Sequence, residues 1–164
     1  MEESKVQIYS GDGHGKSSAA LGKAIQAASA GKKVVFIQFL KGLEQNDFIK
    51  RLEPEIQLFR FEKSEADFIN LPPEQQQEEI QNIKNGLNFA RKVLSTGQCD
   101  LLILDEVLGL VDNSIIEVEE LKKIVDSKPE NVDIIFTGIQ LRDEVCALAD
   151  EVSKIETVQF KVWD

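Results

Sequence analysis

The residues best suited to chemistry lie near the start of the chain, in the stretch IYSGDGHGKSSAAL at positions 8–21. An apolar run leads into three glycines at alternate positions, then into Lys-Ser, and then into an alanine-rich segment. Glycines let the backbone take positive φ angles and approach a ligand closely, and the N–H groups at the start of a helix attract anions. This order of strand, glycine loop, Lys-Ser and helix predicts a phosphate-binding loop.

The side chains of this loop have separate expected roles. The Lys16 ammonium can neutralise phosphate oxygens, and the Ser17 hydroxyl can bind a Mg²⁺ ion that those oxygens hold. Ser10 stands where the common pattern has its first glycine, so the loop is a variant. His14, the only histidine, is either a phosphate donor or acid, or an exposed loop residue. We expect nucleotide contacts along the whole loop, from Ser10, Gly11, Asp12, Gly13, His14, Gly15, Lys16, Ser17 and Ser18. The alternative is a glycine-rich turn before an ordinary helix.

A second candidate group ends the apolar run DLLILDE at positions 100–106. In phosphate-loop proteins, a strand beside the loop delivers a carboxylate to the Mg²⁺ shell. Asp105 and Glu106 point to opposite sides if the strand continues through them, so one can serve the metal while the other positions substrate or braces the loop. We prefer Glu106 to Asp105 as the metal contact, and expect Lys16, Ser17 and Glu106 to act in catalysis. The alternative is a strand that ends in solvated acids.

The elements that must position these residues alternate along the chain. Apolar runs predict buried strands at 6–9, 34–39, 56–61, 101–104 and 132–137, and the alternation of Val158, Phe160 and Val162 predicts a sixth strand near a sheet edge. Helical patterns lie at 17–30, 74–94, 116–125 and 142–149. Together they predict one α/β domain over residues 1–164. Its expected fold is three-layered and P-loop NTPase-like, a mostly parallel sheet of about six strands with helices on both faces.

Ligands of such sheets bind beyond the carboxyl ends of the strands. Thr137-Gly138 end a predicted strand on that side, so they are candidate nucleotide contacts, or else a plain strand-to-helix turn. The segments 40–47 and 62–73 also follow strands and lack clear periodicity. We expect these two segments to be substrate loops that overhang the ligand.

Composition limits the classes of partner. The formal net charge is −10, a field that disfavours binding to nucleic acid or to anionic membranes. No stretch has the length and apolar character of a membrane span, and the start MEESKVQIY lacks the features of a signal peptide. Two cysteines, Cys99 and Cys146, have neither metal-binding nor disulfide spacing. We expect them to be inert buried thiols in a cytoplasmic protein.

Four stretches give the chain a family resemblance. YSGDGHGKSSAALG, VVFIQFLKG, DLLILDEVLGLV, and IIFTG followed by ALADEVSKI resemble the ATP:corrinoid adenosyltransferases of P-loop type, over nearly the whole chain up to about Glu156. The resemblance implies that a Co(I) corrinoid attacks the 5′ carbon of ATP and that inorganic triphosphate leaves, in adenosylcobalamin biosynthesis or salvage. It also implies ATP and Mg²⁺ at the loop, contacts from Phe39 and Lys41, and an aromatic residue, here Phe68, that excludes a lower ligand from the cobalt. Phe68 is alternatively a core or loop-anchoring residue.

The family also implies a homodimer and an electron donor such as flavodoxin or a reduced flavin. Three cations of the family pattern are missing, because Gln26, Ile139 and His14 stand where it often has basic residues, and its basic tail is absent. Two alternatives to adenosyl transfer therefore stay open. One is another phosphate-loop enzyme, a thymidine-kinase-like kinase or an ATPase, although two cysteines do not supply that kinase's four-cysteine zinc site. The other is a non-catalytic corrinoid or nucleotide binder.

Overall fold

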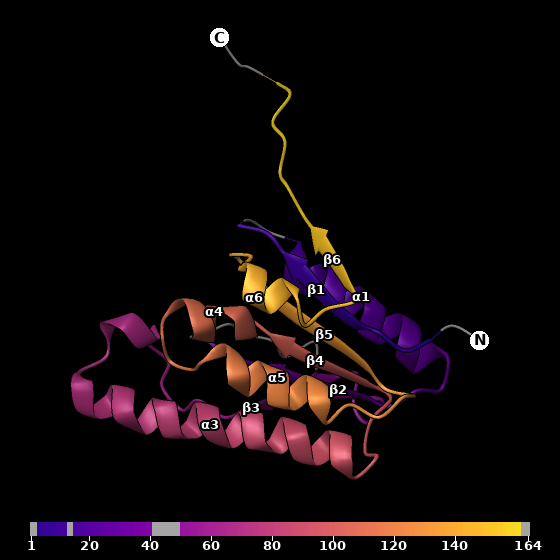
Figure 1. The fold of residues 1–164 in the computed structure, drawn as a ribbon, viewed down its shortest axis with the longest axis horizontal. Coiled ribbons are helices and arrows are strands. Elements are labelled where there is room, and N and C mark those ends of the chain that lie inside the picture. The colour runs from indigo at the N-terminus through magenta and orange to yellow at the C-terminus, as the bar shows by residue number, and fades with distance from the viewer. Residues whose placement is uncertain (1–2, 13–14, 41–49, 162–164) are drawn as a thin grey trace.

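The computed structural model describes residues 3–12, 15–40 and 50–161. Its strands are β1 (Val6–Ser10), β2 (Val34–Gln38), β3 (Ile56–Arg60), β4 (Leu101–Asp105), β5 (Asp133–Gly138) and β6 (Glu151–Lys154). Its helices are α1 (Lys16–Ser29), the short 3₁₀ helix η1 (Phe68–Asn70), α3 (Pro73–Ser95), α4 (Val107–Asp112), α5 (Val118–Asp126) and α6 (Asp143–Cys146). Figure 1 shows how these elements are arranged.

The six strands form one parallel sheet in the order β3-β2-β4-β5-β1-β6. Because all strands run the same way, their carboxyl ends meet along one edge of the sheet. At that edge Ser10 pairs with Gly138 and Gln38 pairs with Asp105. The sheet therefore gathers the end of the phosphate loop's strand and the end of the acidic strand in one place, as a parallel α/β sheet should.

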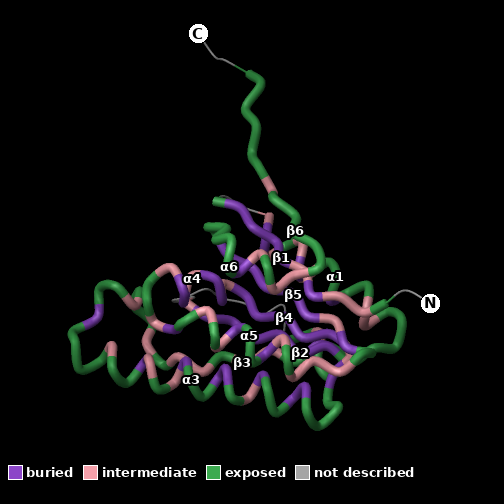
Figure 2. The backbone as a smooth tube through the Cα atoms, in the orientation of Figure 1, coloured by how far each residue is buried: buried purple, intermediate pink, exposed green. Residues whose placement is uncertain are grey.

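Both faces of the sheet are covered, since the strands are apolar at consecutive positions. On one face, Tyr9, Phe36, Ile103 and Ile135 pack with Ala20 and Ala24 of α1. On the other face, the alternate strand residues pack with α3, α4 and α5, as Ile37, Leu104 and Phe136 do. Figure 2 shows long buried stretches along the central strands, and β2, β4 and β5 are buried at nearly every position. The predicted three-layer fold is confirmed.

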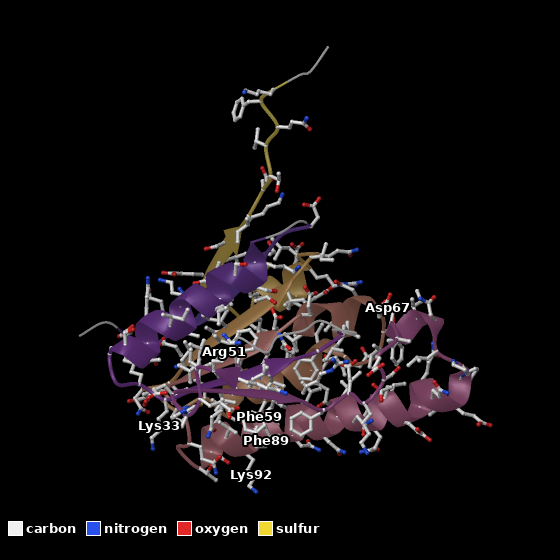
Figure 3. All side chains as sticks on the ribbon, turned by 180° about the vertical axis from the view of Figure 1, so that it is seen from behind. Lys33, Arg51, Phe59, Asp67, Phe89 and Lys92 are labelled. Carbon is white, nitrogen blue, oxygen red and sulfur yellow. The ribbon has the colours of Figure 1, made fainter. Side chains whose placement is uncertain are left out.

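Aromatic side chains close the β3 edge of the sheet against α3. The ring of Phe89 on α3 lies 4.6 Å from that of Phe59 and 5.4 Å from that of Phe61, between centroids, and Figure 3 labels Phe59 and Phe89 side by side. Gly86 allows this approach, because a Cβ there would lie 3.1 Å from both Phe39 and Phe61. The helix predicted at 74–94 is thus α3, the longest described helix, and it packs along the face of the sheet that also contacts α4 and α5.

The prediction of a sixth strand at Val158, Phe160 and Val162 is wrong for the described residues, while Val162 lies outside them. Val158 and Phe160 are 63% and 91% exposed in a segment that extends away from the body of the protein, as Figures 1 and 2 show. The strand beside β1 is instead Glu151–Lys154. Asp150 sets its register, because its N–H donates to Val6 O and its carboxylate accepts the N–H of Val6, each at 2.8 Å. Residues 151–154 therefore already pair with the outer edge of β1, so residues 158 and 160 have no place there.

The other predicted elements differ only in extent. The five remaining strands and the helices at 17–30 and 74–94 are confirmed within two residues. The helix predicted at 116–125 begins at Val118, and that predicted at 142–149 is the four-residue α6. A helix that the sequence did not predict, α4, follows β4 directly. In the described part of the chain, no helix is both long and apolar enough to cross a membrane.

Candidate active site

The predicted phosphate loop connects the end of β1 to the start of α1. The N–H of Gly11 donates to the carbonyl of Gly138 at 3.2 Å, which anchors the start of the loop beside β5. Gly15 has a φ of 126°, a value that favours glycine, and directly precedes the first turn of α1. Asp12 and Ser18 are exposed at this end of the sheet, while Gly13 and His14 lie outside the described residues.

Ser17 and Asp105 meet at the base of this loop. The Ser17 hydroxyl donates to Asp105 Oδ1 at 2.7 Å, and the Thr137 hydroxyl donates to the same oxygen at 2.7 Å. Asp105 is fully buried as the last residue of β4, and Thr137 is fully buried in β5. Three neighbouring segments of the chain therefore place their oxygen atoms around one carboxylate.

Lys16 and Glu106 form the second pair at this edge. Lys16 Nζ lies 2.7 Å from Glu106 Oε1, and the two side chains are only 10% and 14% exposed. Glu106 adopts a left-handed backbone conformation with a φ of 63° and a ψ of 16°, unusual for a residue with a side chain. Its N–H donates to the Thr137 hydroxyl at 2.8 Å. The strand therefore ends at Asp105, and the turn at Glu106 sends its carboxylate to Lys16.

Helix α4 holds this turn against the end of β5. A Cβ added at Gly138 would lie 2.3 Å from Cβ of Leu108, so only glycine fits between the strand and the helix. The side chain of Leu40 also packs closely on α4, because a Cβ at Gly109 would lie 2.8 Å from its Cδ1. The geometry of Glu106 is therefore fixed by packing on both sides of the short helix.

The oxygen donors at the base of the loop suit Mg²⁺ chemically. A serine hydroxyl and a carboxylate are hard ligands, and Mg²⁺ is usually bound by one or two such groups together with substrate phosphates. No cluster of three or more His, Cys, Asp or Glu side chains that could hold a metal alone is found in the described residues. Ser17 and Asp105, which contact each other at 2.7 Å, match in type and number the protein ligands that Mg²⁺ takes beside substrate phosphates.

The two predicted substrate loops begin at touching residues. The N–H of Leu40 donates to Glu62 Oε1 at 2.7 Å, and Glu79, only 5% exposed, accepts the N–H of Lys63 at 3.1 Å. Burial raises the pKa of Glu62; the hydrogen bond from the Leu40 N–H opposes this rise, and the weaker effects of the Glu79 carboxylate, which raises the pKa, and of Arg60, which lowers it, follow. The two segments are thus tied together where they leave the sheet.

The other predicted site residues do not contact the phosphate loop, or they lie outside the residues that the structure describes. Phe39 is 1% exposed in the core beside α3, although its N–H donates to Asp105 O at 3.0 Å. Phe68 is half-buried in η1, where its carbonyl accepts from Gln76 at 3.1 Å. Ile139 is 52% exposed just after β5. Lys41 lies outside the described residues.

Gln26 is not beside the phosphate loop. It lies ten residues after Lys16 on α1, about 15 Å along the helix axis. There it lines a cavity of about 550 Å³ with Lys5 and Asp133, near the amino ends of the strands. The helix therefore carries residue 26 to the opposite end of the sheet from the phosphate loop.

Sequence reasoning missed one neighbour of the loop. Ile155, just after β6, donates its N–H to Ser10 O at 2.7 Å. Its carbonyl would lie 2.7 Å from a Cβ at Gly11, and its side chain 3.3 Å from a Cβ at Gly15. Gly11 and Gly15, which we expected to allow close approach of a ligand, are thus also needed for the close packing of Ile155 on the loop. The sequence signal that could have indicated this contact is an apolar residue directly after the edge strand.

Comparison with known proteins agrees with this geometry. Solved structures of similar fold include a KaiC-like protein from Pyrococcus horikoshii OT3, with a TM-score of 0.59 at 16% identity over 95% of this chain and 74% of that one. EssC (ATPases 2 and 3) from Geobacillus thermodenitrificans has a TM-score of 0.51 at 12% identity, over 92% of this chain and 32% of that one. At these identities the likeness concerns the fold alone.

Sequence relatives are more specific. Corrinoid adenosyltransferases of Escherichia coli (strain K12) and Salmonella typhimurium are 27% and 26% identical over 158 residues, which span 96% of this chain and 79% of each relative. The model of the family ATP:corrinoid adenosyltransferase BtuR/CobO/CobP matches residues 2–163. With the phosphate loop, the acidic strand end and the parallel sheet in place, the chain belongs to the ATP:corrinoid adenosyltransferase family.

Proposed function

We propose that this chain transfers the 5′-deoxyadenosyl group of ATP to the Co(I) centre of a corrinoid substrate and releases inorganic triphosphate. Family membership supports the ATP-dependent adenosylation of a corrinoid. The observation that carries the site assignment is the meeting of Lys16 with Glu106 and of Ser17 with Asp105, both at 2.7 Å, at the start of α1. A polyphosphate would be bound there by an ammonium, a hydroxyl and the loop amides.

The proposed reaction is a displacement at carbon. The electron pair of Co(I) forms the cobalt–carbon bond at the 5′ carbon, and the bond from that carbon to the triphosphate oxygen breaks, so the leaving oxygen keeps its electron pair. Cobalt is formally oxidised by two electrons, from Co(I) to Co(III), as it forms the alkyl complex. Because Co(I) is itself the nucleophile, no protein base is required. The protein's tasks are to align the reactants and to stabilise the charge that develops on triphosphate.

Lys16 and the loop amides serve the second task in this proposal. A triphosphate in the loop would lie beside the first turn of α1, where the N–H groups point toward an anion. Lys16 would then exchange its contact with Glu106 for phosphate oxygens. Because both side chains are shielded from water, the exchanged contact acts on the leaving group with little screening by solvent.

Ser17 and Asp105 are the residues that would hold Mg²⁺. The Ser17 hydroxyl would turn toward the metal, and Asp105, which receives that hydroxyl here at 2.7 Å, would face the same ion directly or through water. The contact of the Ser17 hydroxyl with Asp105 favours Asp105 for this role, whereas the sequence favoured Glu106, which the move of Lys16 to the phosphates would set free. When bound, the ion would supply positive charge to the departing triphosphate.

Residues around the corrinoid are assigned more broadly. We propose that the segments after β2 and β3, tied by Leu40 and Glu62, hold the corrinoid over the loop, with Lys41 and Phe68 toward the ligand. Three other predicted contacts are buried and would support the site from below rather than touch the corrinoid; these are Phe39, Thr137 and Gly138. Ile139, exposed next to Gly138, contributes an apolar surface rather than a cation.

One assay tests the proposal. The chain is given MgATP and a chemically reduced Co(I) corrinoid, and the phosphorus products are identified by ³¹P NMR. Inorganic triphosphate in equal amount to adenosylated corrinoid is the expected result. Lys16→Ala should lower kcat/KM at least about 100-fold, by comparison with removal of one preorganised donor. Lys122→Ala, which removes an exposed lysine paired with Asp126 on α5, is the matched control and should change little.

The same assay decides between the alternatives. ADP or a nucleoside monophosphate would favour a phosphate-loop kinase or ATPase, and binding without product would favour a corrinoid or nucleotide carrier. We further propose that the enzyme is cytoplasmic and acts as a homodimer, and that flavodoxin or a reduced flavin supplies the electrons that reduce the cobalt of its corrinoid substrate to Co(I). The two free cysteines suit a reducing compartment. One continuous sheet through all six strands supports a single domain over residues 1–164.

A further inference from the structure

Thr137 lies at the centre of the sheet edge that carries the site. It is the next-to-last residue of β5, the strand between β4 and β1, and its side chain is fully buried. Its hydroxyl oxygen lies 2.8 Å from the N–H of Glu106 and 2.7 Å from Oδ1 of Asp105. One hydroxyl therefore touches both acidic residues of the site.

The directions of these two hydrogen bonds follow from the groups involved. A main-chain N–H can only donate, so Thr137 accepts from Glu106 and gives its single hydrogen to Asp105. With its hydrogen used and its side chain buried, Thr137 offers a nucleotide no donor. Its hydroxyl acts on other protein groups.

The first of these groups is the Asp105 carboxylate. Its Oδ1 accepts from Ser17 and from Thr137, each at 2.7 Å. The two donors come from different elements, Ser17 from α1 and Thr137 from β5, so together they restrict the orientation of the carboxylate. In the proposed function Ser17 would turn toward the metal, and the Thr137 hydroxyl would then continue to hold Oδ1.

The second group is the Glu106 turn. A φ of 63° is rare for a residue with a side chain, and the N–H of this turn is held by Thr137. The turn directs the Glu106 carboxylate to Lys16. Loss of the hydroxyl would leave a polar N–H near the core without this acceptor and would free the turn that sets the Lys16 contact.

We propose that Thr137 is a positioning residue, whose one hydroxyl sets Asp105 against Ser17 and Glu106 against Lys16 and thereby couples Mg²⁺ binding to polyphosphate binding. This inference rests on the proposed function, because it takes the ligand to be a polyphosphate that binds with Mg²⁺. It also assigns Thr137 a role through other residues, in place of the nucleotide contact predicted from its position at a strand end.

The test compares Thr137→Val, which keeps the shape of the side chain, with Thr137→Ser, which keeps the hydroxyl. Inorganic tripolyphosphate is titrated into each protein by calorimetry, with and without Mg²⁺. We expect Thr137→Val to lose at least tenfold in affinity with Mg²⁺ and less than threefold without it, while Thr137→Ser stays within threefold of wild type in both. Thr96→Val, which removes an exposed hydroxyl bonded to Lys92 O at 2.7 Å, is the matched control. An unchanged Mg²⁺ effect in folded Thr137→Val would overturn the proposal.

A second measurement needs no variant. Hydrogen exchange of the Glu106 amide in the wild-type protein should be slow, because Thr137 holds it, although this residue lies between a strand and a helix. Fast exchange at this amide would also overturn the proposal, even if Thr137→Val does not fold. If wild type binds no tripolyphosphate while the Glu106 amide is protected, the proposed function fails and the hydrogen bond stands, so the two failures are distinguishable.

Discussion

Lys16 Nζ and Glu106 Oε1 lie 2.7 Å apart in a site that shields both side chains from solvent. Lys16 is the first residue of α1, and Glu106 is the first residue after β4, so the contact joins the phosphate loop to the acidic strand end. The Glu106 carboxylate therefore occupies the position on Lys16 that we propose for a phosphate oxygen.

Glu106→Gln should increase the affinity for tripolyphosphate in the absence of Mg²⁺. The substitution keeps the size of the side chain but removes the charge that competes for Lys16, and we expect a gain of about five- to tenfold, roughly 1 kcal/mol. Calorimetric titration measures it. Glu120→Gln, which weakens an exposed pair with Lys123, is the control and should have no effect. Equal or weaker binding by Glu106→Gln would show that the pair does not compete with phosphate.

Gly138→Ala should destabilise the protein and disturb the site. A Cβ at this position would lie 2.3 Å from Cβ of Leu108, so α4 must move away from the end of β5. We expect a loss of about 2–3 kcal/mol in the free energy of unfolding, typical of an overpacked core. Urea denaturation measures it. Gly22→Ala is the matched control on α1, where nothing lies within 4 Å, and should stabilise by about 0.5–1 kcal/mol.

Glu62 should make the protein less stable as pH rises. Its pKa in the folded protein is raised above the ordinary value of 4.5, chiefly by burial and also by Glu79. A carboxyl with a raised folded pKa contributes its stability below the unfolded pKa and loses it as pH rises through the folded pKa. Glu62→Gln, whose carbonyl can still accept the Leu40 N–H, should therefore be more stable than wild type at pH 7–8.

The difference between Glu62→Gln and wild type should vanish below about pH 4.5, where the unfolded glutamate is also protonated. Urea denaturation at a series of pH values measures this, with exposed Glu65→Gln as the control. A stability difference that is constant across this range would show that the Glu62 carboxyl is not the cause.

The two cysteines should differ in reactivity. Burial raises the pKa of the Cys99 thiol to about 12, and the charge of Asp100 adds to the rise. At pH 8 only about one Cys99 side chain in 10⁴ is then the reactive thiolate. Iodoacetamide should therefore modify half-buried Cys146 first and reach Cys99 only on unfolding, as peptide mass spectrometry can show. Modification of Cys99 in the folded Cys146→Ser protein would contradict this.

Much of the fold could be predicted because its signals are local. Apolar runs gave five of the strands within two residues, and the long amphipathic pattern gave α3. The sixth strand could not be placed, because the sequence alternates in a β-like way at 158–162, whereas the segment that pairs with β1 is Glu151–Lys154. The hydrogen bonds of Asp150 with Val6 select this segment, and the sequence pattern does not reveal them. Helix α4 has six apolar or short residues, too few to show a helical period.

The sequence proposes the residues of the candidate site but not the contacts between them. Order along the chain identifies Lys16, Ser17, Asp105 and Glu106 as candidates. Which acid meets which partner depends on the strand ending at Asp105 and on the left-handed turn at Glu106, and both depend on the buried hydroxyl of Thr137, 31 residues further along the chain. No spacing rule predicts a contact between residues that are this far apart in the sequence.

All of these interpretations require that the loop between β1 and α1 binds the polyphosphate of ATP. A crystal structure of the chain with Mg²⁺ and a non-reacting ATP analogue would show where that polyphosphate lies. We expect phosphate oxygens on the amides that precede Ser18, Lys16 Nζ moved from Glu106 to the phosphates, and Mg²⁺ at the Ser17 hydroxyl. A polyphosphate bound elsewhere, with Lys16 still paired to Glu106, would contradict it.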